Sequence, residues 1–251
     1  MEDLVELLNQ NLIYSFLLLF ARILAFMAFM PVFGHKSVSA TLRVALTFYF
    51  TLFLYPLVDG NTYTYTTDGD FILAIISELT LGLVASIFVQ IVFSAIQIVG
   101  DLIGFATSLS MASMFDPATG TQQGIVSRFL YMIVLVLYFE SGMYEVTLYM
   151  LANSIGIIHI GEFNLYDYDD VSMAISEVSN MFLFAFSFAF PLFFIGFILD
   201  IYYSYGTKSM PAFSPFVLTF QIKFTLIFLF LMFGLDIFVH SFEMYFINKF
   251  Q

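Results

Sequence analysis

Charged side chains inside apolar segments are the residues of this sequence best suited to do chemistry. Placing an ionisable group in such a segment costs free energy, so each one is a functional candidate. A proton relay would use groups of this kind, and structural ion pairs explain them equally well. Arg22 and Glu78 form a pair under some helix tilts, whereas Lys223 and Asp236 lie more than three turns apart along one helix. The candidates are Arg22, Glu78, Glu140, Glu145, Asp200, Lys223 and Asp236.

A stripe of polar and small residues begins at one of these charges. Its members recur every three or four residues, a spacing that places them on one face of a helix. Between helices in a membrane, small and hydrogen-bonding residues either hold the helices together or face water. Two interpretations therefore remain open, ordinary helix packing and a water-lined path. The stripe consists of Glu78, Gly82, Ser86, Gln90, Ser94, Gln97 and Asp101, with Gly104 following.

The segment 104–120, GFATSLSMASMFDPATG, combines small residues with methionines and a turn. Proline fixes φ and pushes the residue before it out of the helical region, so Asp116 and Pro117 predict a turn. We therefore expect a helix that ends in a small-residue loop tipped with Met111, Met114 and Phe115. The alternative is that both methionines fill a helix interface, because methionine adapts to irregular gaps.

Recognised catalytic and cofactor motifs are missing. The chain has no Gly-x-Ser-x-Gly elbow, no His-Glu-x-x-His, no phosphate-binding loop and no dinucleotide fingerprint. It has no cysteine, its three histidines are widely separated, and the acidic loop 161–170 lacks the ligand spacing of an EF-hand. An intramembrane serine hydrolase would need a partner for Ser154 that the sequence does not supply. We predict no catalytic residue, no metal site, no cofactor and no enzymatic activity.

Composition places the chain in a membrane. Hydrophobic residues make up 61%, charged residues 10%, and the mean hydropathy is +0.96. Soluble domains carry about 25% charged residues. The net charge of −12, without any basic cluster, excludes nucleic acid as a partner. The first residues, MEDLVELLNQN, lack the positive region of a secretory signal, so we expect the first apolar segment to be retained.

Six apolar stretches are long enough to cross a bilayer, which needs about 20 helical residues. The sequence predicts an all-α integral membrane protein with about six long helices. The two longest stretches exceed one simple crossing, so they are expected to be tilted, broken or extended beyond the bilayer. The stretches lie near residues 12–33, 41–58, 71–100, 128–158, 180–203 and 215–241.

Loop charges suggest an orientation. Lys36, Arg43, Arg128 and Lys208 lie in alternate loops, whereas the loops 59–70 and 161–179 carry acids and no base. The positive-inside rule then places the basic loops in the cytoplasm and both termini on the other side. Lys249 is the one charge that opposes this orientation.

Residues 78–120 resemble the signature region of the FliR family, the flagellar type III export-gate proteins whose virulence-system relatives are called SctT. The matching residues there are Glu78, Gly82, Leu109, Ser110, Ala112, Asp116 and Pro117. Outside this region the matches are Arg22, Pro31, Phe33, Gly34, Arg43, Pro56, Gly142, Ser154 and Pro191. The run 210–224 departs from the family and keeps only the frame of Pro211, Phe216 and Lys223.

The resemblance implies a core subunit of the export gate in the flagellar basal body, in the bacterial inner membrane. Residues 1–175 would form a FliP-like part, and residues 176–251 a FliQ-like helical hairpin. One such chain would join several FliP-like and FliQ-like subunits in a hetero-oligomer that passes unfolded export substrates. In that assembly the apolar faces would cover partner helices, largely above the membrane plane.

The resemblance also implies roles for two groups of residues. Met111, Met114 and Phe115, closed by Asp116 and Pro117, would contribute to a plug that excludes water by dewetting. The hairpin residues Lys208, Pro211, Phe216 and Lys223 would face the switch protein FlhB. Apart from the resemblance, we predict that Arg22 is a structural charge.

A secondary transporter is the alternative from another class, because it uses similar polar stripes and buried charges. That class predicts inverted repeats and paired broken helices around a central site. The two halves of this sequence show no self-similarity. The choice between a flagellar and a virulence system stays open at this point.

Overall fold

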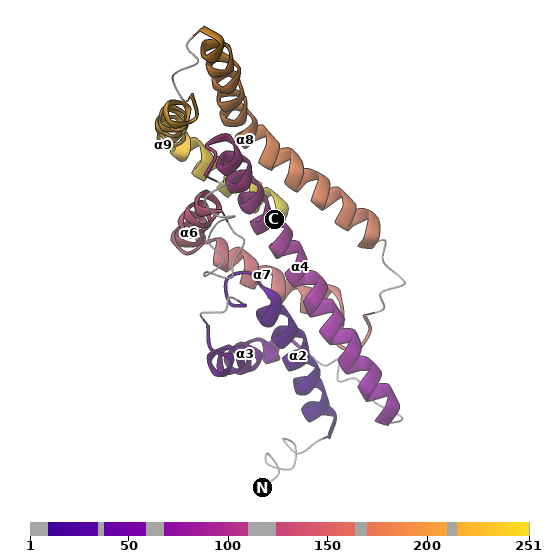
Figure 1. Ribbon diagram of the computed structural model, residues 1–251. Coiled ribbons are helices and arrows are strands. Elements are labelled where there is room, and N and C mark those ends of the chain that lie inside the picture. The colour runs from indigo at the N-terminus through magenta and orange to yellow at the C-terminus, as the bar shows by residue number, and fades with distance from the viewer. Residues whose placement is uncertain are drawn as a thin grey trace. The chain divides into compact units, whose positions relative to one another are not determined.

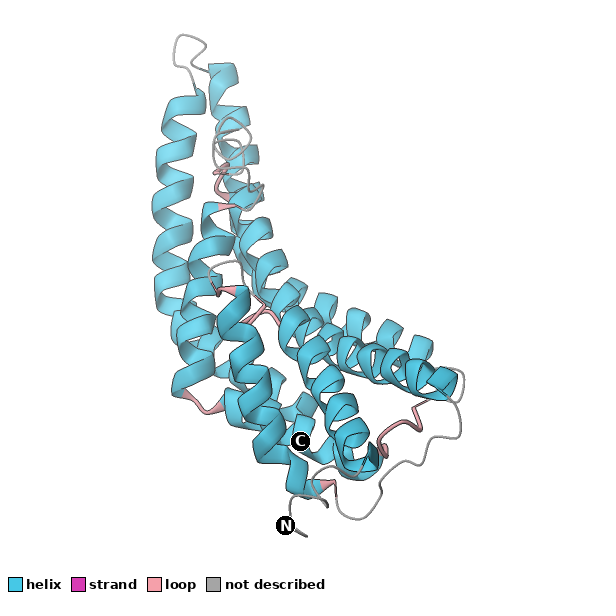
Figure 2. Ribbon diagram, turned by 90° about the horizontal axis from the view of Figure 1, so that it is seen from below, coloured by secondary structure: helices cyan, strands magenta, loops and turns pink. Residues whose placement is uncertain are grey.

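The computed structural model describes residues 10–34, 38–58, 68–109, 124–163, 170–209 and 215–250. Within these ranges every regular element is a helix (Figure 2). The expected all-α fold is confirmed. The elements are α2 (Gln10–Phe29), α3 (Ala40–Leu54), η1 (Tyr55–Leu57), α4 (Asp68–Ala106), α6 (Ile125–Glu140), α7 (Met143–Ile157), α8 (Asp170–Ser209) and α9 (Pro215–Phe250) (Figure 1).

The predicted apolar stretches coincide with these helices. Five helices in the described part of the chain are long and apolar enough to cross a membrane, or six if the bent pair α6 and α7 counts as one span. Helices α4, α8 and α9 contain 39, 40 and 36 residues. A simple crossing needs about 20 residues, so all three extend well beyond that length.

Of the two longest predicted stretches, one lies within a single helix and the other is divided between two helices. The stretch 71–100 is part of the uninterrupted helix α4, which extends past it at both ends. The stretch 128–158 is broken between α6 and α7, where Gly142 has φ of 76°. Side chains disfavour this left-handed conformation, so a glycine here lets the chain change direction.

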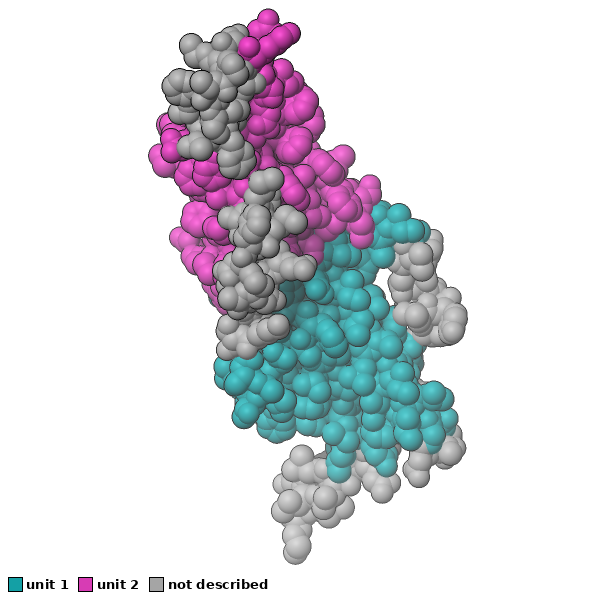
Figure 3. All heavy atoms as spheres, in the orientation of Figure 1, with its two compact units in different colours: residues 1–91, 144–177 teal, residues 92–143, 178–251 magenta. Residues whose placement is uncertain are grey.

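The chain divides into two compact units that alternate along the sequence (Figure 3). Unit 1 comprises Met1–Ile91 and Tyr144–Glu177, and unit 2 comprises Val92–Met143 and Val178–Gln251. Helices α4 and α8 therefore contribute residues to both units. These two units are not the two parts expected from the sequence, residues 1–175 and 176–251. That expected division is based on resemblance to two smaller proteins, and it stays a prediction.

Unit 1 is built on α2, whose buried side chains include Leu18, Ile23 and Phe26. Helix α3 packs against α2, and the Tyr55 hydroxyl that follows α3 donates to the Leu12 carbonyl at 3.2 Å. At the start of α3, the Ser39 hydroxyl accepts from the Leu42 amide and caps the helix. These contacts fix the position of α2, which carries Arg22.

Unit 2 is held together by aromatic side chains. The Phe93 ring of α4 lies 5.7 Å from the Tyr138 ring of α6 and 6.5 Å from the Phe246 ring of α9, edge to face. Such pairs stabilise beyond their buried area.

In α8 and α9, Phe184 stacks on Tyr245, and Phe188 lies 4.7 Å from Phe238. Farther along, Asp200 of α8 accepts from Lys223 of α9. Contacts that advance along α8 move back along α9, so these two helices run antiparallel.

Candidate functional site

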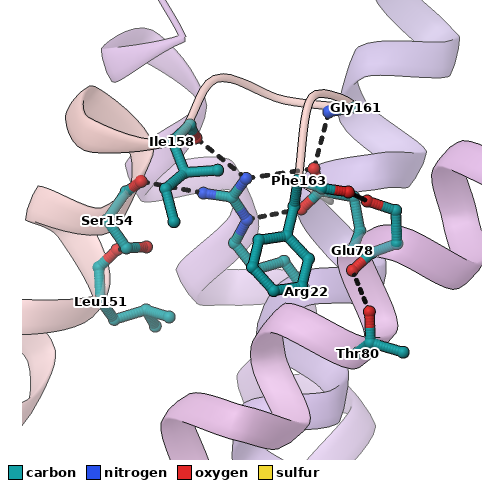
Figure 4. A network of polar contacts seen from close by, with 9 residues as sticks. Arg22, Glu78, Thr80, Leu151, Ser154, Ile158, Gly161 and Phe163 are labelled. Atoms are coloured by element: carbon teal, nitrogen blue, oxygen red, sulfur yellow. Dashed lines mark hydrogen bonds and ion pairs between the residues drawn. The ribbon is translucent and has the colours of Figure 1, made fainter. Parts of the chain in front are cut away.

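A buried ion pair between α2 and α4 is the central polar feature of unit 1. Arg22 is 1% exposed and Glu78 is fully buried. The Nε atom of Arg22 donates to Oε2 of Glu78 at 2.5 Å, and Nη2 donates to Oε1 at 3.1 Å (Figure 4). Two parallel bonds between a guanidinium and a carboxylate are the strong, orientation-specific form of this interaction.

Both members of the pair also bond to backbone atoms at the C-terminal end of α7 (Met143–Ile157) and just after it. Arg22 Nη1 donates to the Ser154 carbonyl and Nη2 to the Ile158 carbonyl, both at 3.1 Å. The Gly161 amide donates to Glu78 Oε1 at 2.7 Å (Figure 4). A positive charge is favourable beside carbonyls at a helix C-terminus. The network therefore ties α2, α4 and α7 together.

Gly82 lets α4 approach α2 one turn after Glu78. A Cβ atom at this position would lie 2.2 Å from the Arg22 carbonyl oxygen and 2.9 Å from Cβ of Ala25. Backbone atoms cannot move away as a flexible side chain can. The next residue of the stripe, Ser86, is fully buried, and its hydroxyl donates to the Leu83 carbonyl within α4. This part of the stripe is a close helix contact.

The far end of the stripe makes a second helix contact, in unit 2. The Ser127 hydroxyl of α6 donates to Oδ1 of Asp101, and a Cβ at Gly100 would lie 2.2 Å from Cα of Ser127. Between the two ends, Gln90 is exposed, and Ser94 and Gln97 are partly buried. At both ends the geometry favours helix packing over a water-lined path.

The ion pair Lys223 with Asp200 links α9 to α8. The Lys223 ammonium donates to both carboxylate oxygens of Asp200, at 2.7 and 2.9 Å. Lys223 is 4% exposed, whereas Asp200 is 54% exposed. Sequence reasoning missed this partner. Asp200 lies about as far before the end of α8 as Lys223 lies after the start of α9, and two antiparallel helices bring such positions to the same level.

The other charges in the apolar segments are exposed. Glu140, Glu145 and Asp236 all reach the surface, and the Tyr144 hydroxyl donates to Glu145 at 3.0 Å. Within the described ranges no group of three or more histidine, aspartate or glutamate side chains is placed to hold a metal ion.

The predicted plug lies outside the described residues. This applies to Met111, Met114, Phe115, Asp116 and Pro117, and to Pro211 of the hairpin. Lys208 is exposed near the end of α8, and Phe216 belongs to the first turn of α9. Lys223 directs its charge to Asp200 inside the hairpin.

Comparison with known proteins gives a consistent result along the chain. Residues 13–248 match the model of a family described as bacterial export proteins, family 1. The chain is 26% identical over 223 residues to the flagellar biosynthetic protein FliR of Bacillus subtilis strain 168, covering 88% of this chain and 86% of the relative. It is 24% identical over 225 residues to the Aquifex aeolicus protein of the same name, covering 89% and 86%. The Pectobacterium carotovorum protein of that name is 30% identical over 129 residues, 51% of this chain and 49% of the relative.

Proposed function

Because this chain belongs to family 1 of the bacterial export proteins, we propose that it is a core subunit of the flagellar type III export gate in the bacterial inner membrane. With FliP-like and FliQ-like subunits it forms the channel that passes unfolded flagellar substrates. The observation that carries the proposal is similarity to flagellar biosynthetic proteins FliR along nearly the whole chain, 88% in the Bacillus subtilis comparison.

The exposed apolar surface supports assembly with other subunits. The parts of α8 and α9 that are apolar enough to cross a membrane are Ser172–Gly206 and Phe220–Lys249, and only 22% of each is buried. Large side chains such as Phe190, Phe197 and Phe233 are exposed. Contiguous apolar surface of this extent is covered by lipid or by other protein. A hetero-oligomeric gate supplies both kinds of cover.

The buried polar contacts fit a subunit that must hold its shape inside such an assembly. Every nitrogen of the Arg22 guanidinium and both carboxylate oxygens of Glu78 have a hydrogen-bond partner within this chain. In an apolar environment an unsatisfied charge would be far more costly. We propose that this pair is a structural brace of the subunit and has no part in a proton relay.

We propose that Met111, Met114 and Phe115 contribute to the seal of the resting channel, with Asp116 and Pro117 closing the loop. Support comes from the residue types, because flexible methionines adapt to whatever fills the gap and an apolar constriction dewets. The hairpin residues Lys208, Pro211 and Phe216 are proposed to face FlhB. Lys223 was expected at the same surface, but it is 4% exposed and bound to Asp200, so we propose that it holds α9 against α8 instead. Lys208 is exposed near the C-terminal end of α8, which supports a contact surface at the end of the hairpin where α8 is joined to α9.

The proposed topology places both termini on the non-cytoplasmic side, and the proposed division assigns 1–175 to a FliP-like part and 176–251 to a FliQ-like hairpin. Basic residues near helix ends support the proposed topology: Arg43 and Arg128 lie in the first turns of α3 and α6, and Lys208 lies in the last turn of α8. The antiparallel α8 and α9 support the proposed division.

Copurification tests the function. A tagged copy of this chain, purified in mild detergent, is expected to carry FliP-like and FliQ-like proteins in fixed ratios. A chain that stays stable alone or as a homo-oligomer, and that never carries those subunits, contradicts the proposal.

A further inference from the structure

Helix α8 carries a serine and a proline within an exposed apolar face, four residues apart. We infer that Ser187, with its backbone carbonyl freed by Pro191, accepts a hydrogen bond from a helix of a neighbouring protein subunit, and that the donor is an uncharged side chain. This role rests on the proposed function in one respect, because it requires that the chain is assembled with other subunits. Both residues belong to unit 2.

The exposed face of α8 is formed by residues that share one side of the helix. At about 100° per residue, Leu183, Ser187, Phe190 and Phe194 lie within about 60° of one another. Leu183 is 71%, Phe190 57% and Phe194 49% exposed, and Ser187 is exposed as well. The opposite side of the helix includes the fully buried Ala189. Ser187 therefore lies within an apolar face that points away from the core of unit 2.

Pro191 frees a backbone acceptor on this face. Helix α8 continues from Asp170 to Ser209 with this proline inside it. In an α-helix the Ser187 carbonyl would accept from the N–H of residue 191, but proline has no N–H and its ring clashes with that carbonyl. The Ser187 carbonyl oxygen therefore lacks its α-helical donor, at an exposed position.

The Ser187 hydroxyl cannot replace that donor. It donates to the Leu183 carbonyl at 2.6 Å, one turn earlier in α8. A hydroxyl has one hydrogen, so its oxygen offers only acceptor lone pairs to any other group. Ser187 thus presents two neutral oxygen acceptors to whatever covers this face.

These two acceptors distinguish between the possible covers of the face. Lipid tails contain no donor, so a lipid cover would leave both oxygens unsatisfied in an apolar medium, which is costly. A cationic donor would be buried against neutral oxygens, which costs more still. A hydroxyl or amide side chain on a partner helix satisfies the oxygens without either cost, and the small serine lets that helix approach closely. An uncharged donor on a protein helix is therefore the occupant that fits.

Two substitutions remove the acceptors in different ways. Ser187→Ala removes the hydroxyl oxygen, whereas Pro191→Ala gives residue 191 an N–H that occupies the Ser187 carbonyl within α8. The measurement is the rate at which this chain dissociates from the purified gate after transfer to a harsher detergent. We expect each variant to dissociate about three- to tenfold faster, the effect of one hydrogen bond between membrane helices.

Ser176→Ala is the matched control and should leave the dissociation rate unchanged. Ser176 is also exposed on α8, and its hydroxyl donates to the Met173 carbonyl at 2.7 Å. Residue 180, four positions later, is an asparagine and keeps its backbone N–H. The control therefore repeats the loss of a serine hydroxyl without a freed carbonyl.

The stability of the isolated chain is the second readout, and for Pro191→Ala it should move in the opposite direction. The isolated variant should unfold at a higher denaturant concentration, because a proline inside a helix costs free energy. If Pro191→Ala alone speeds dissociation, the proline only shapes α8 and the inference is overturned. Unchanged dissociation in both variants overturns it as well, and so does an isolated chain that Pro191→Ala fails to stabilise.

Photocrosslinking in the native membrane identifies the occupant. A Phe190→benzoylphenylalanine variant places the photoreactive group beside Ser187, and we expect it to crosslink to a helix of another subunit that carries a hydroxyl or amide side chain. Crosslinks to lipid alone, or to a segment whose only donors are lysine or arginine, overturn the inference. If export-gate subunits copurify and Phe190 crosslinks only to lipid, the proposed function stands without this contact. If the crosslinked helix belongs to a protein outside the gate and no gate subunit copurifies, the proposed function is wrong and the acceptor role of Ser187 stands.

Discussion

Arg22 and Glu78 face each other with both carboxylate oxygens engaged, at 2.5 and 3.1 Å, and with almost no exposure to solvent. A buried pair of this kind contributes little relative to apolar residues of the same size, but removing one partner leaves an uncompensated charge. We therefore expect Arg22→Met or Glu78→Leu alone to destabilise the protein by about 3–5 kcal/mol. Denaturant unfolding of the purified protein in detergent measures this.

The double variant Arg22→Met with Glu78→Leu is the decisive control. It should recover most of the stability that either single change loses, because no charge is then left unpaired. Strictly additive losses would mean that the two side chains do not interact.

Gly82 and Gly156 provide a matched pair of substitutions. Gly82→Ala should destabilise the protein by about 1–3 kcal/mol, because the new Cβ would meet the Arg22 carbonyl at 2.2 Å. Gly156→Ala in α7 meets nothing within 4 Å, and should stabilise the helix by up to about 1 kcal/mol. Thermal unfolding of the two variants side by side checks the difference. Equal effects would contradict the close approach of α2 and α4.

The pair Lys223 with Asp200 predicts an asymmetric result. Asp200→Asn leaves a buried ammonium without a counter-charge and should cost about 3–5 kcal/mol. Lys223→Met removes the buried charge and leaves an acid that is already 54% exposed, so the loss should be no more than about 1 kcal/mol. Unfolding of the purified complex in denaturant ranks the two variants. The reverse ranking would show that Asp200 lies in an apolar environment.

The proposed seal predicts ion leakage. Replacing Met111, Met114 and Phe115 by alanine should raise the resting conductance of the assembled gate, because smaller side chains leave room for water. Conductance is recorded with the gate in a planar bilayer. Met173→Ala, at an exposed position in α8, is the control and should not leak. An intact gate that carries the triple substitution and stays tight would exclude the plug role.

The helices could be predicted from the sequence because hydropathy depends only on local composition. The stretches 12–33 and 41–58, for example, begin and end within a few residues of α2 and of α3 with η1. The break at Gly142 was one of several possible outcomes, since length alone cannot distinguish a tilted helix from a broken one. Which option the chain takes depends on the positive φ of one residue.

The polar contacts were less predictable because they join helices that are distant in sequence. Arg22 with Glu78 could be named only as a possible pair, since the partner depends on how α2 and α4 cross. The contribution of α7 through the Ser154 and Ile158 carbonyls is invisible in a sequence, because every residue has a carbonyl. The spacing of the stripe did not indicate that its two ends contact different helices, one in each unit.

The alternation of the two units along the chain constrains the order in which they can complete their folding. Residues 92–143 of unit 2 emerge from the ribosome before unit 1 has received Tyr144–Glu177, and they wait for Val178–Gln251 to complete their own core. Domains usually mature in sequence as they are made. Here the nascent chain carries two unfinished cores at once. The rings of Phe93 and Tyr138 are therefore made before Phe246, the ring that packs against them. Until α9 is synthesised, we expect the translocation machinery or a neighbouring subunit to cover these two rings.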